Sequence, residues 1–270
     1  MKVALLQLCA GEKKEANVQQ AVSMAQQALS QGAAFVLLPE VFNFRLTRAH
    51  SEGKKKELYR QAAEKIPGPS TGVFMALAQK HKASFLLGSI LEKATRDYVY
   101  NTSVFINPSG QITARYRKIH LFDACLGRRV IKESDCLRAG RRLTTAKVKD
   151  LRVGLSICYD VRFPGLYQNY GRRGVDILTV PSCFTKKTGE AHWEVLLRSR
   201  AIENLCYVLA PNQVGPFKAQ GSQAYGHSMI ISPWGQVIAQ GRARAQEIIF
   251  ADISLTQVNK ARAILPGIVS

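Results

Sequence analysis

Residues Gly154 to Pro164 read GLSICYDVRFP. An apolar strand runs into Cys158, and Pro164 then starts a helix, because proline suits the first helical turn. This order of strand, thiol and helix is typical of the sharp turn that holds a nucleophile above a sheet. The backbone N–H of Tyr159 would lie beside that thiol as an oxyanion donor. The alternative interpretation is that Cys158 is only a small buried core residue.

Strands and helices alternate on both sides of this segment. Apolar runs typical of strands cover Val3–Cys9, Ala34–Leu38, Ser84–Leu91, Val99–Ile106, Gln111–Tyr116, Leu151–Ile157, Val175–Val180, Cys206–Ala210, Ser228–Ser232, Gln236–Ala239 and Ile248–Ile253. Helical patterns cover Lys14–Gln31, Thr71–Lys82, Pro164–Arg173 and Ala191–Asn204. Asp123–Arg142 has little periodicity and predicts a long loop. Because no composition break marks a linker, we expect residues 1–270 to form one α/β domain, a sandwich with a mixed sheet.

The composition is that of a globular protein with a large positive charge. Its 270 residues are 46% hydrophobic and 21% charged, which excludes a disordered chain, a collagen, a coiled coil and a disulfide miniprotein. The 38 Lys and Arg against 19 Asp and Glu leave a formal net charge of +19. That surplus fits a polyanionic partner, an anionic substrate or simply a basic surface.

The six cysteines indicate neither a zinc site nor a secreted scaffold. None belongs to a CxxC pair, so structural zinc is not expected. The apolar run from Val3 contains Gln7 and ends in charged residues, which indicates a first strand and not a signal peptide. No apolar run reaches the ~20 residues that span a bilayer. The sequence therefore predicts a cytoplasmic protein without a membrane partner.

Two further segments place polar groups near predicted strand ends. Glu40 follows an apolar strand in LLPEVF, and Lys118 lies in YRKIHLFD, residues Tyr116–Asp123. Taken singly, Glu40 is also consistent with a surface residue, and Lys118 with a charged edge strand. Catalytic groups of α/β sheets, however, gather beyond the carboxyl ends of strands. Together with Cys158 they suggest one site, in which a lysine favours the thiolate and a carboxylate accepts the thiol proton.

These three motifs, in this order, resemble the nitrilase, or carbon–nitrogen hydrolase, superfamily over nearly the whole chain. The resemblance implies an α-β-β-α sandwich, no cofactor, and a homodimer or higher homo-oligomer paired through helices near the active site. It makes Glu40 the general base, Lys118 the cation that stabilises the tetrahedral intermediate, and Cys158 the nucleophile. Glu133, in VIKESD, matches a second active-site glutamate of the family.

The resemblance also implies a reaction. Cys158 would attack an amide carbonyl, ammonia would leave, and water would hydrolyse the resulting thioester. Lys118 and the backbone N–H of Tyr159 would hold the oxyanion. The expected enzyme is therefore a cofactor-independent thiol amidohydrolase acting on a small anionic amide.

The segment Pro181 to Val208 narrows the range of candidate substrates. It is similar to the branch that cleaves amides of α-keto acids, which includes deaminated-glutathione amidase and the ω-amidase for α-ketoglutaramate. The pattern TG-AHWE-LL-R-RA favours the first of these. Since arginine binds carboxylates in a bidentate manner, Arg162 and Arg198 are candidate substrate contacts. Each is also consistent with a structural ion pair, with Asp160 or with Glu194.

Two other functions stay open. The same catalytic residues would serve an N-carbamoyl or aliphatic amidase or a nitrile hydrolase, and the motifs do not discriminate among them. An inactive family member that binds nucleic acid is the alternative outside this class, and its motivation is a set of clustered cations. These are Arg128-Arg129, Arg141-Arg142, Arg172-Arg173 and Lys54–Lys56. Because no nucleic-acid-binding motif is present and aromatic residues are not interleaved, we favour solvated loop charges.

Overall fold

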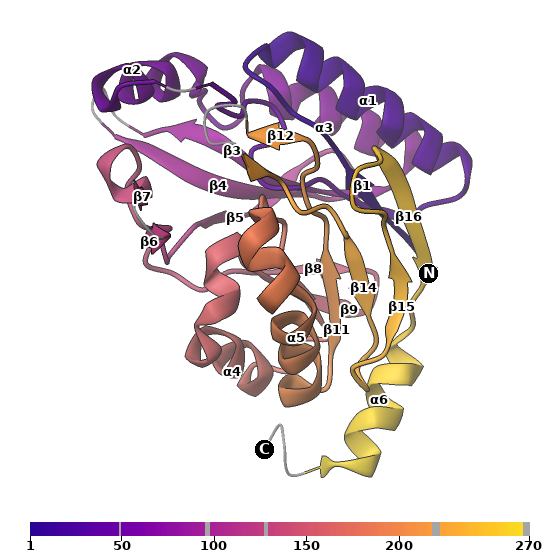
Figure 1. Cartoon of the computed structure of the whole chain (residues 1–270). Coiled ribbons are helices and arrows are strands. Elements are labelled where there is room, and N and C mark those ends of the chain that lie inside the picture. Colours follow the sequence, from indigo (N-terminus) through magenta and orange to yellow (C-terminus); the bar gives the residue numbers. More distant parts are fainter. Residues whose placement is uncertain (49, 95–97, 127–128, 218–221, 267–270) are drawn as a thin grey trace.

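Two six-stranded sheets pack face to face in the computed structural model, which describes residues 1–48, 50–94, 98–126, 129–217 and 222–266 (Figure 1). The first sheet has the order β16 (Glu247–Asp252), β1 (Lys2–Gln7), β2 (Phe35–Leu37), β3 (Ser84–Lys93), β4 (Val99–Ile106) and β5 (Ile112–Arg117). The second has the order β15 (Val237–Gln240), β14 (Met229–Ile231), β11 (Tyr207–Ala210), β10 (Ile177–Thr179), β9 (Leu151–Leu155) and β8 (Thr145–Val148).

Both sheets are mixed, and they are built alike. In the first, β1, β2 and β3 are parallel, and the flanking strands are antiparallel. In the second, β9, β10 and β11 are parallel between antiparallel neighbours. Central parallel strands are buried on both faces, which explains their short, continuously apolar sequences.

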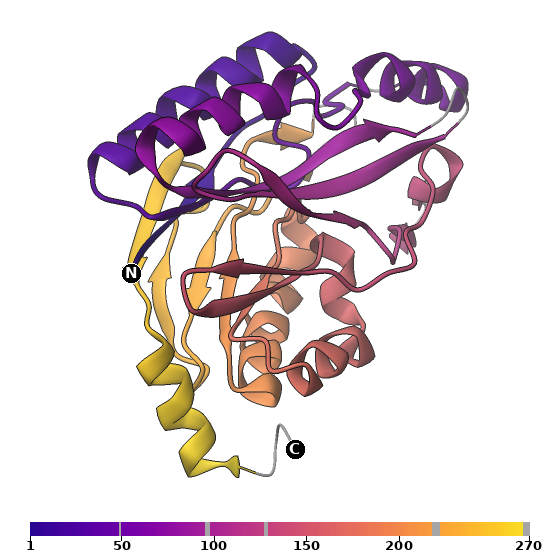
Figure 2. The same ribbon diagram turned by 180° about the vertical axis from the view of Figure 1, so that it is seen from behind.

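Helices cover the outer face of each sheet (Figures 1 and 2). On the first sheet lie α1 (Lys14–Ser30) and α3 (Pro69–His81), and on the second α4 (Pro164–Arg172) and α5 (Lys186–Asn204). Small residues at helical spacing, Ala21, Ala25 and Ala28, form the buried face of α1. Apolar side chains of both sheets, Phe35 and Leu155 among them, share the core between the sheets. The α-β-β-α sandwich implied by the resemblance is therefore confirmed.

Two helices were not predicted from the sequence. One is α2 (Glu52–Ala62), which has a strongly polar sequence and whose buried residue is Ala62. Its start is fixed by Ser51, whose hydroxyl accepts the backbone N–H of Lys54 at 3.4 Å. The other is α6 (Leu255–Ile264), which directly follows the last strand of the first sheet. Both have too narrow an apolar face for periodicity to reveal them.

The predicted long loop at Asp123–Arg142 was wrong in part. It contains the antiparallel pair β6 (Asp123–Leu126) and β7 (Arg129–Lys132), followed by a single 3₁₀ turn, η1 (Glu133–Asp135). Strands of four residues without apolar alternation leave no period to detect. Arg128, one of the clustered cations, lies outside the described residues. Within the described ranges, none of the helices combines the length and apolar character needed to span a bilayer.

Candidate active site

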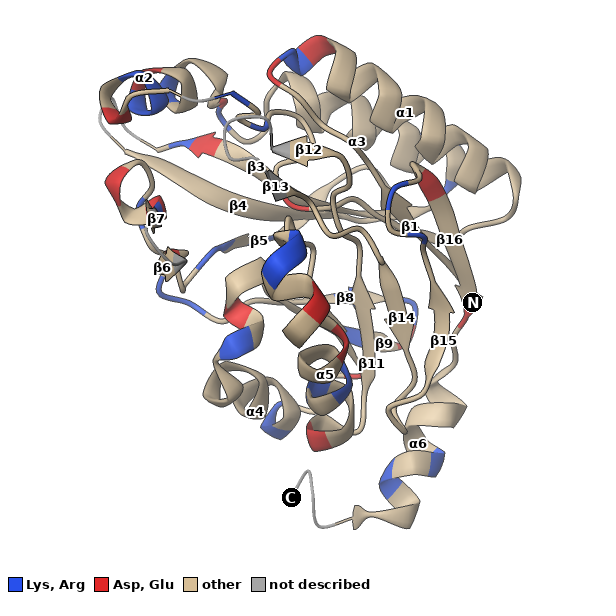
Figure 3. Ribbon diagram, in the orientation of Figure 1, with Lys and Arg blue, Asp and Glu red and all other residues tan. Residues whose placement is uncertain are grey.

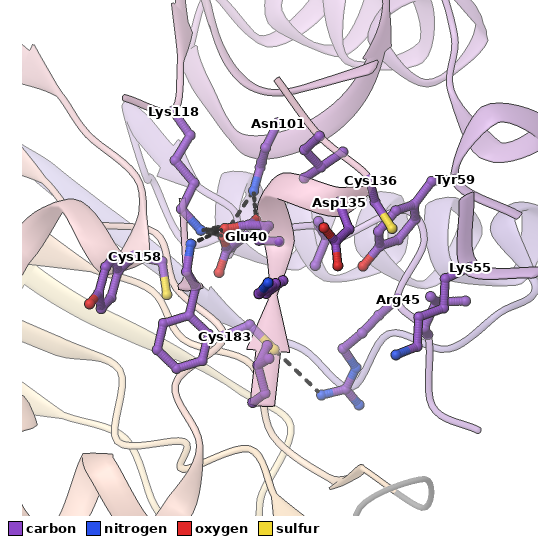
Figure 4. Close-up of a pocket in the computed structure, with 18 of the residues that line it drawn as sticks. Glu40, Arg45, Lys55, Tyr59, Asn101, Lys118, Asp135, Cys136, Cys158 and Cys183 are labelled. Atoms are coloured by element: carbon purple, nitrogen blue, oxygen red, sulfur yellow. Dashed lines mark hydrogen bonds and ion pairs between the residues drawn. The ribbon is translucent and has the colours of Figure 1, made fainter. Parts of the chain in front are cut away.

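Polar residues that follow three strands converge on one cavity. Glu40 is the third residue after β2, Lys118 the first after β5, and Cys158 the third after β9. With Glu133, at the start of η1, they line a cavity of about 600 Å³ (Figure 4). The structure thus brings together the four side chains that the sequence and the resemblance singled out for catalysis.

A glycine allows the two sheets to approach closely beside this cavity. A Cβ atom at Gly88, in β3, would lie 1.8 Å from the carbonyl oxygen of Leu38 and 2.5 Å from Cβ of Pro181. Leu38 precedes the Glu40 turn, and Pro181 accepts the backbone N–H of Cys158 at 2.9 Å. Only a residue without a side chain fits there, so Gly88 sets how near the two halves of the site can come.

Lys118 lies between two carboxylates at the inner end of the cavity. Its Nζ atom is 2.9 Å from Oε1 of Glu40 and 2.8 Å from Oε2 of Glu133, and the side chain is 2% exposed. Burial alone would lower the pKa of Lys118, but the charges of Glu133 and Glu40 outweigh it and raise that pKa well above its usual value. The ammonium group therefore stays charged at neutral pH, as an electrostatic stabiliser must.

Asn101, which sequence reasoning missed, holds the same two carboxylates. Its Nδ2 atom donates to Glu40 at 2.9 Å and to Glu133 at 3.4 Å, and its backbone carbonyl accepts the N–H of Lys118 at 2.9 Å. The backbone N–H of Phe122 donates to Glu133 at 2.7 Å. An asparagine within a β-strand gives no sequence signal of such a role, because only the sheet register brings it beside β5.

Cys158 occupies a strained turn at the start of the short 3₁₀ helix η2 (Cys158–Arg162). Its φ is +49°, a left-handed conformation that is rare for a residue with a side chain, and Val41, next to Glu40, has the same φ. This strain agrees with the sharp turn predicted from the sequence. The carboxylate of Glu40 and the backbone N–H of Cys183 act on this thiol in opposite directions: Glu40 raises its pKa and the Cys183 N–H lowers it. Burial, and then the charge of Glu40, raise the pKa of the Cys158 thiol well above its usual value.

Asp160 connects the lysine segment to the cysteine segment. This fully buried carboxylate accepts the hydroxyl of Tyr116 at 2.7 Å and the backbone N–H of Ile157 at 2.9 Å. It also accepts the backbone N–H of His120 at 2.9 Å and lies 2.8 Å from Nδ1 of that histidine. The His120 ring stacks on Phe163 at 3.6 Å. The residues that flank Lys118 at a distance of two and the residue directly before Cys158 are therefore held by one carboxylate.

Arg162 and Tyr159 also line the cavity. The Arg162 guanidinium lies 5.4 Å from the ring centre of Phe184, and its Nη1 atom is 3.2 Å from Nδ1 of His192. The ion pair between Arg162 and Asp160, which the sequence left open, is not among those of the described residues, since Asp160 faces His120. Arg162 is therefore placed where an anionic group of a bound molecule could reach it.

Arg198 is placed elsewhere. It is not among the described residues that line the cavity. Its Nε atom donates to the carbonyl of Gly235 at 2.9 Å, and its Nη1 atom is 3.3 Å from Glu194 on the same helix. This geometry corrects the expectation of substrate contact: Arg198 ties α5 to the turn between β14 and β15, and the sequence pattern alone could not show which way it faced.

The described part of the chain holds no group of three or more His, Cys, Asp or Glu residues that could bind a metal ion. The cavity itself presents a thiol, a carboxylate that can accept its proton, and a fixed ammonium group.

Comparisons with known proteins give the class of this site. Residues 2–263 match the carbon-nitrogen hydrolase family. Human omega-amidase NIT2 is 38% identical over 266 residues, which cover 98% of this chain and 92% of that protein. The deaminated glutathione amidase of Yersinia enterocolitica is 39% identical over 245 residues, covering 88% and 82%. The crystal structure of Saccharomyces cerevisiae Nit3, a member of branch 10 of the nitrilase superfamily, superimposes with a TM-score of 0.85 at 32% identity, covering 98% and 94%.

The chain belongs to the carbon-nitrogen hydrolase family, which the sequence motifs predicted. It is a hydrolase acting on non-peptide carbon–nitrogen bonds. Within the nitrilase superfamily it falls in the amidase branch that holds omega-amidase NIT2 and deaminated glutathione amidase. The similarity to both is nearly equal, so it leaves the particular amide to be argued from the site.

Proposed function

We propose that this protein is a cofactor-independent thiol amidohydrolase that cleaves the amide of a small α-keto acid, with Cys158 as the nucleophile. The observation that carries the proposal is the arrangement of Glu40. This one carboxylate is ion-paired with the buried Lys118 at 2.9 Å, it lines the same cavity as Cys158, and its charge raises the pKa of the Cys158 thiol. A base placed between the nucleophile and a fixed cation suits acyl transfer.

The first half of the reaction forms a thioester. Because its pKa is raised, the thiol is neutral at rest, so Glu40 removes its proton as sulfur attacks the amide carbon. The carbonyl electrons move to oxygen, where Lys118 and the backbone N–H of Tyr159 face the new negative charge. Donors of this kind lower the barrier by about 3–4 kcal/mol. The C–N bond then breaks, and the leaving amine takes the proton from Glu40.

The second half returns the enzyme to its starting state. Glu40 removes a proton from water as that water attacks the thioester carbonyl, and the C–S bond breaks to release the acid. The Cys158 sulfur recovers the proton from Glu40. In this scheme Glu133 acts through Lys118: its two oxygens, at 2.8 and 3.1 Å from Nζ, keep the ammonium group aimed at the oxyanion.

The two candidate substrates share an acyl part and differ in the leaving group. α-Ketoglutaramate is a primary amide and releases ammonia. The amide of deaminated glutathione is formed with the cysteine nitrogen, so its hydrolysis releases cysteinylglycine, which corrects the expectation of ammonia for that substrate. Arg162 is the proposed partner of the keto-acid carboxylate that both substrates carry. We favour deaminated glutathione because a cavity of about 600 Å³ has room for its larger leaving group.

The proposal is tested by assaying both amides in parallel, with liquid chromatography for cysteinylglycine and an enzymatic assay for ammonia. We expect kcat/KM to be higher for deaminated glutathione. A preference for α-ketoglutaramate would make the protein an ω-amidase. If the protein hydrolyses neither amide but does hydrolyse an N-carbamoyl compound, an aliphatic amide or a nitrile, the proposed reaction mechanism stands and the proposed substrate is refuted.

We further propose a cytoplasmic homodimer or higher homo-oligomer that pairs through α5. Large apolar side chains are exposed on α5 and on the adjoining turn between β14 and β15: Val195 at 66%, Ile202 at 43% and Trp234 at 50%. Burying such a patch would be favourable. Light scattering should give a dimer or larger mass for the protein and a monomer mass for Trp234→Glu. Nucleic acid is not part of this proposal, since no recognition motif accompanies the exposed cations.

A further inference from the structure

The cavity has a second cationic end, formed by two side chains that the reaction does not use. Arg45 follows the Glu40 turn, and Lys55 lies in α2, whose block of lysines appears blue in Figure 3. Both line the same cavity as Cys158. In Figure 4 Lys55 and Arg45 lie on the other side of the picture from Cys158, and the Arg45 guanidinium points toward Cys183. Arg162 belongs to η2, beside the nucleophile, so the two cationic ends arise from different parts of the fold.

Arg45 is rigidly held and close to the reacting centre. Its side chain is buried, and Nε donates to the carbonyl of Ala10 at 2.8 Å. Nη1 lies 3.9 Å from Sγ of Cys183, whose backbone N–H in turn lowers the pKa of the Cys158 thiol. One residue therefore separates this guanidinium from the nucleophile. A fixed arginine at that distance would orient a ligand with little further loss of side-chain entropy.

Lys55 differs from its neighbours on α2. Lys54 is paired with Glu57 at 2.8 Å and is about half exposed, as an ordinary surface lysine is. Lys55 is half-buried against the cavity and forms no ion pair with any residue in the described ranges. Its charge acts on the Cys136 thiol inside the cavity, where it opposes the rise in the Cys136 pKa that burial causes. The lysine thus directs its charge into the cavity.

Two acidic side chains share this rim with Lys55. Glu52 and Asp135 also line the cavity, but neither forms an ion pair with Lys55 among the described residues. A carboxylate bound between the two cations would offset the repulsion between them. A carboxylate is the anion that arginine binds best in a bidentate manner, with lysine as a second point charge.

We infer that Arg45 and Lys55 form a second anion-binding subsite, which takes a carboxylate on the amine part of the amide. The inference rests on the proposed amidase function and narrows its substrate class. It requires an amide with two separated anionic groups, one on the acyl side toward Arg162 and one on the leaving group. The terminal carboxylate of cysteinylglycine meets this requirement, whereas the ammonia released from α-ketoglutaramate does not.

The test is a specificity ratio: kcat/KM for deaminated glutathione divided by kcat/KM for α-ketoglutaramate. In Lys55→Gln we expect this ratio to fall about tenfold, mainly through KM for the larger amide, since one charge-assisted contact is lost. Lys55→Glu should lower it further. Lys54→Gln, which makes the same charge change on the same helix outside the cavity, should leave the ratio at the value of the unmodified protein.

The outcomes separate the subsite from the function. An unchanged ratio in both Lys55 variants, or an equal fall in Lys54→Gln, would overturn the subsite. So would a protein that hydrolyses α-ketoglutaramate alone, while its amidase function would stand. Hydrolysis of neither amide would refute the proposed substrate class together with the subsite.

Discussion

The two ends of the cavity, an inner end around Lys118 and an outer end around Arg45 and Lys55, hold their charged side chains in different ways. At the inner end, Lys118 is 2% exposed, and each of its carboxylate partners receives hydrogen bonds from elements far apart in the sequence. At the outer end, α2 and the β6–β7 hairpin present charged side chains with few partners. The charged groups of the inner end are thus fixed by one another, whereas Lys55 at the outer end forms no ion pair within the described ranges.

This difference suggests that the residues of the inner end carry out the reaction and those of the outer end select the substrate. A buried, fully paired set of charges is costly to disturb, so it fixes the chemistry. Charges on a polar helix and a short hairpin contribute little to folding, so they are free to match a ligand. Mutations at the inner end should therefore change kcat, and mutations at the outer end should change KM.

The strongest test of the contrast compares two thiols of one cavity. Cys158→Ala should lower kcat by at least a thousandfold, because it removes the nucleophile. Cys183→Ala should change kcat by less than about threefold, because Cys183 contributes its backbone N–H and not its sulfur. Initial rates on the better substrate give kcat for both variants, and circular dichroism verifies that both are folded. Comparable losses in the two variants would break the distinction.

Lys118→Met should affect both rate and stability. It leaves Glu40 and Glu133 buried without a cation, which typically costs about 3–5 kcal/mol. The loss of the oxyanion cation should also lower kcat by about a hundredfold or more. Urea denaturation measures the first effect, and single-turnover rates below the unfolding transition measure the second. A variant with normal stability would show that the carboxylates are not ionised in the folded protein.

Asp160→Asn should have a smaller effect, through the position of other residues. The amide can accept fewer of the contacts with Tyr116, Ile157 and His120, so we expect kcat to fall about tenfold with little change in KM. The rate of alkylation of Cys158 by iodoacetamide should change in parallel, which a loss of overall stability alone would not cause. An altered KM with an unaltered kcat would show instead that Asp160 acts on substrate binding and not on the reaction.

The smallest expected effect is a loss of stability at alkaline pH. The folded state raises the pKa of Cys158 above its usual 9.0 and that of Lys118 above its usual 10.5. Both groups thus hold their protons more tightly in the folded than in the unfolded chain. Their contribution to stability is complete below about pH 9 and is lost as the pH rises. Urea midpoints should fall as the pH rises from about 9 to about 11, and less steeply in Cys158→Ala; an identical slope would contradict the assignment for the thiol.

The sequence predicted the inner end far better than the outer. Glu40, Lys118 and Cys158 each follow an apolar strand, and strand ends can be located from local pattern. Asn101 and Asp160 were missed as parts of the site because their roles depend on sheet register and on contacts between distant segments. Arg198 was misplaced, since a helical pattern gives spacing but not which flank meets a neighbouring turn. The cations Lys54–Lys56 were noted in the sequence, but its polar composition did not reveal the helix α2, so the place of Lys55 beside the cavity could not be foreseen.

The central claim is that an acyl group is carried on the sulfur of Cys158. The most direct measurement is mass spectrometry of the protein quenched in acid during turnover, followed by peptide mapping. We predict an acyl adduct of the keto acid on the peptide that contains Cys158, and none in Cys158→Ala. An adduct on the peptide of Cys183, or steady turnover by Cys158→Ala, would contradict the account.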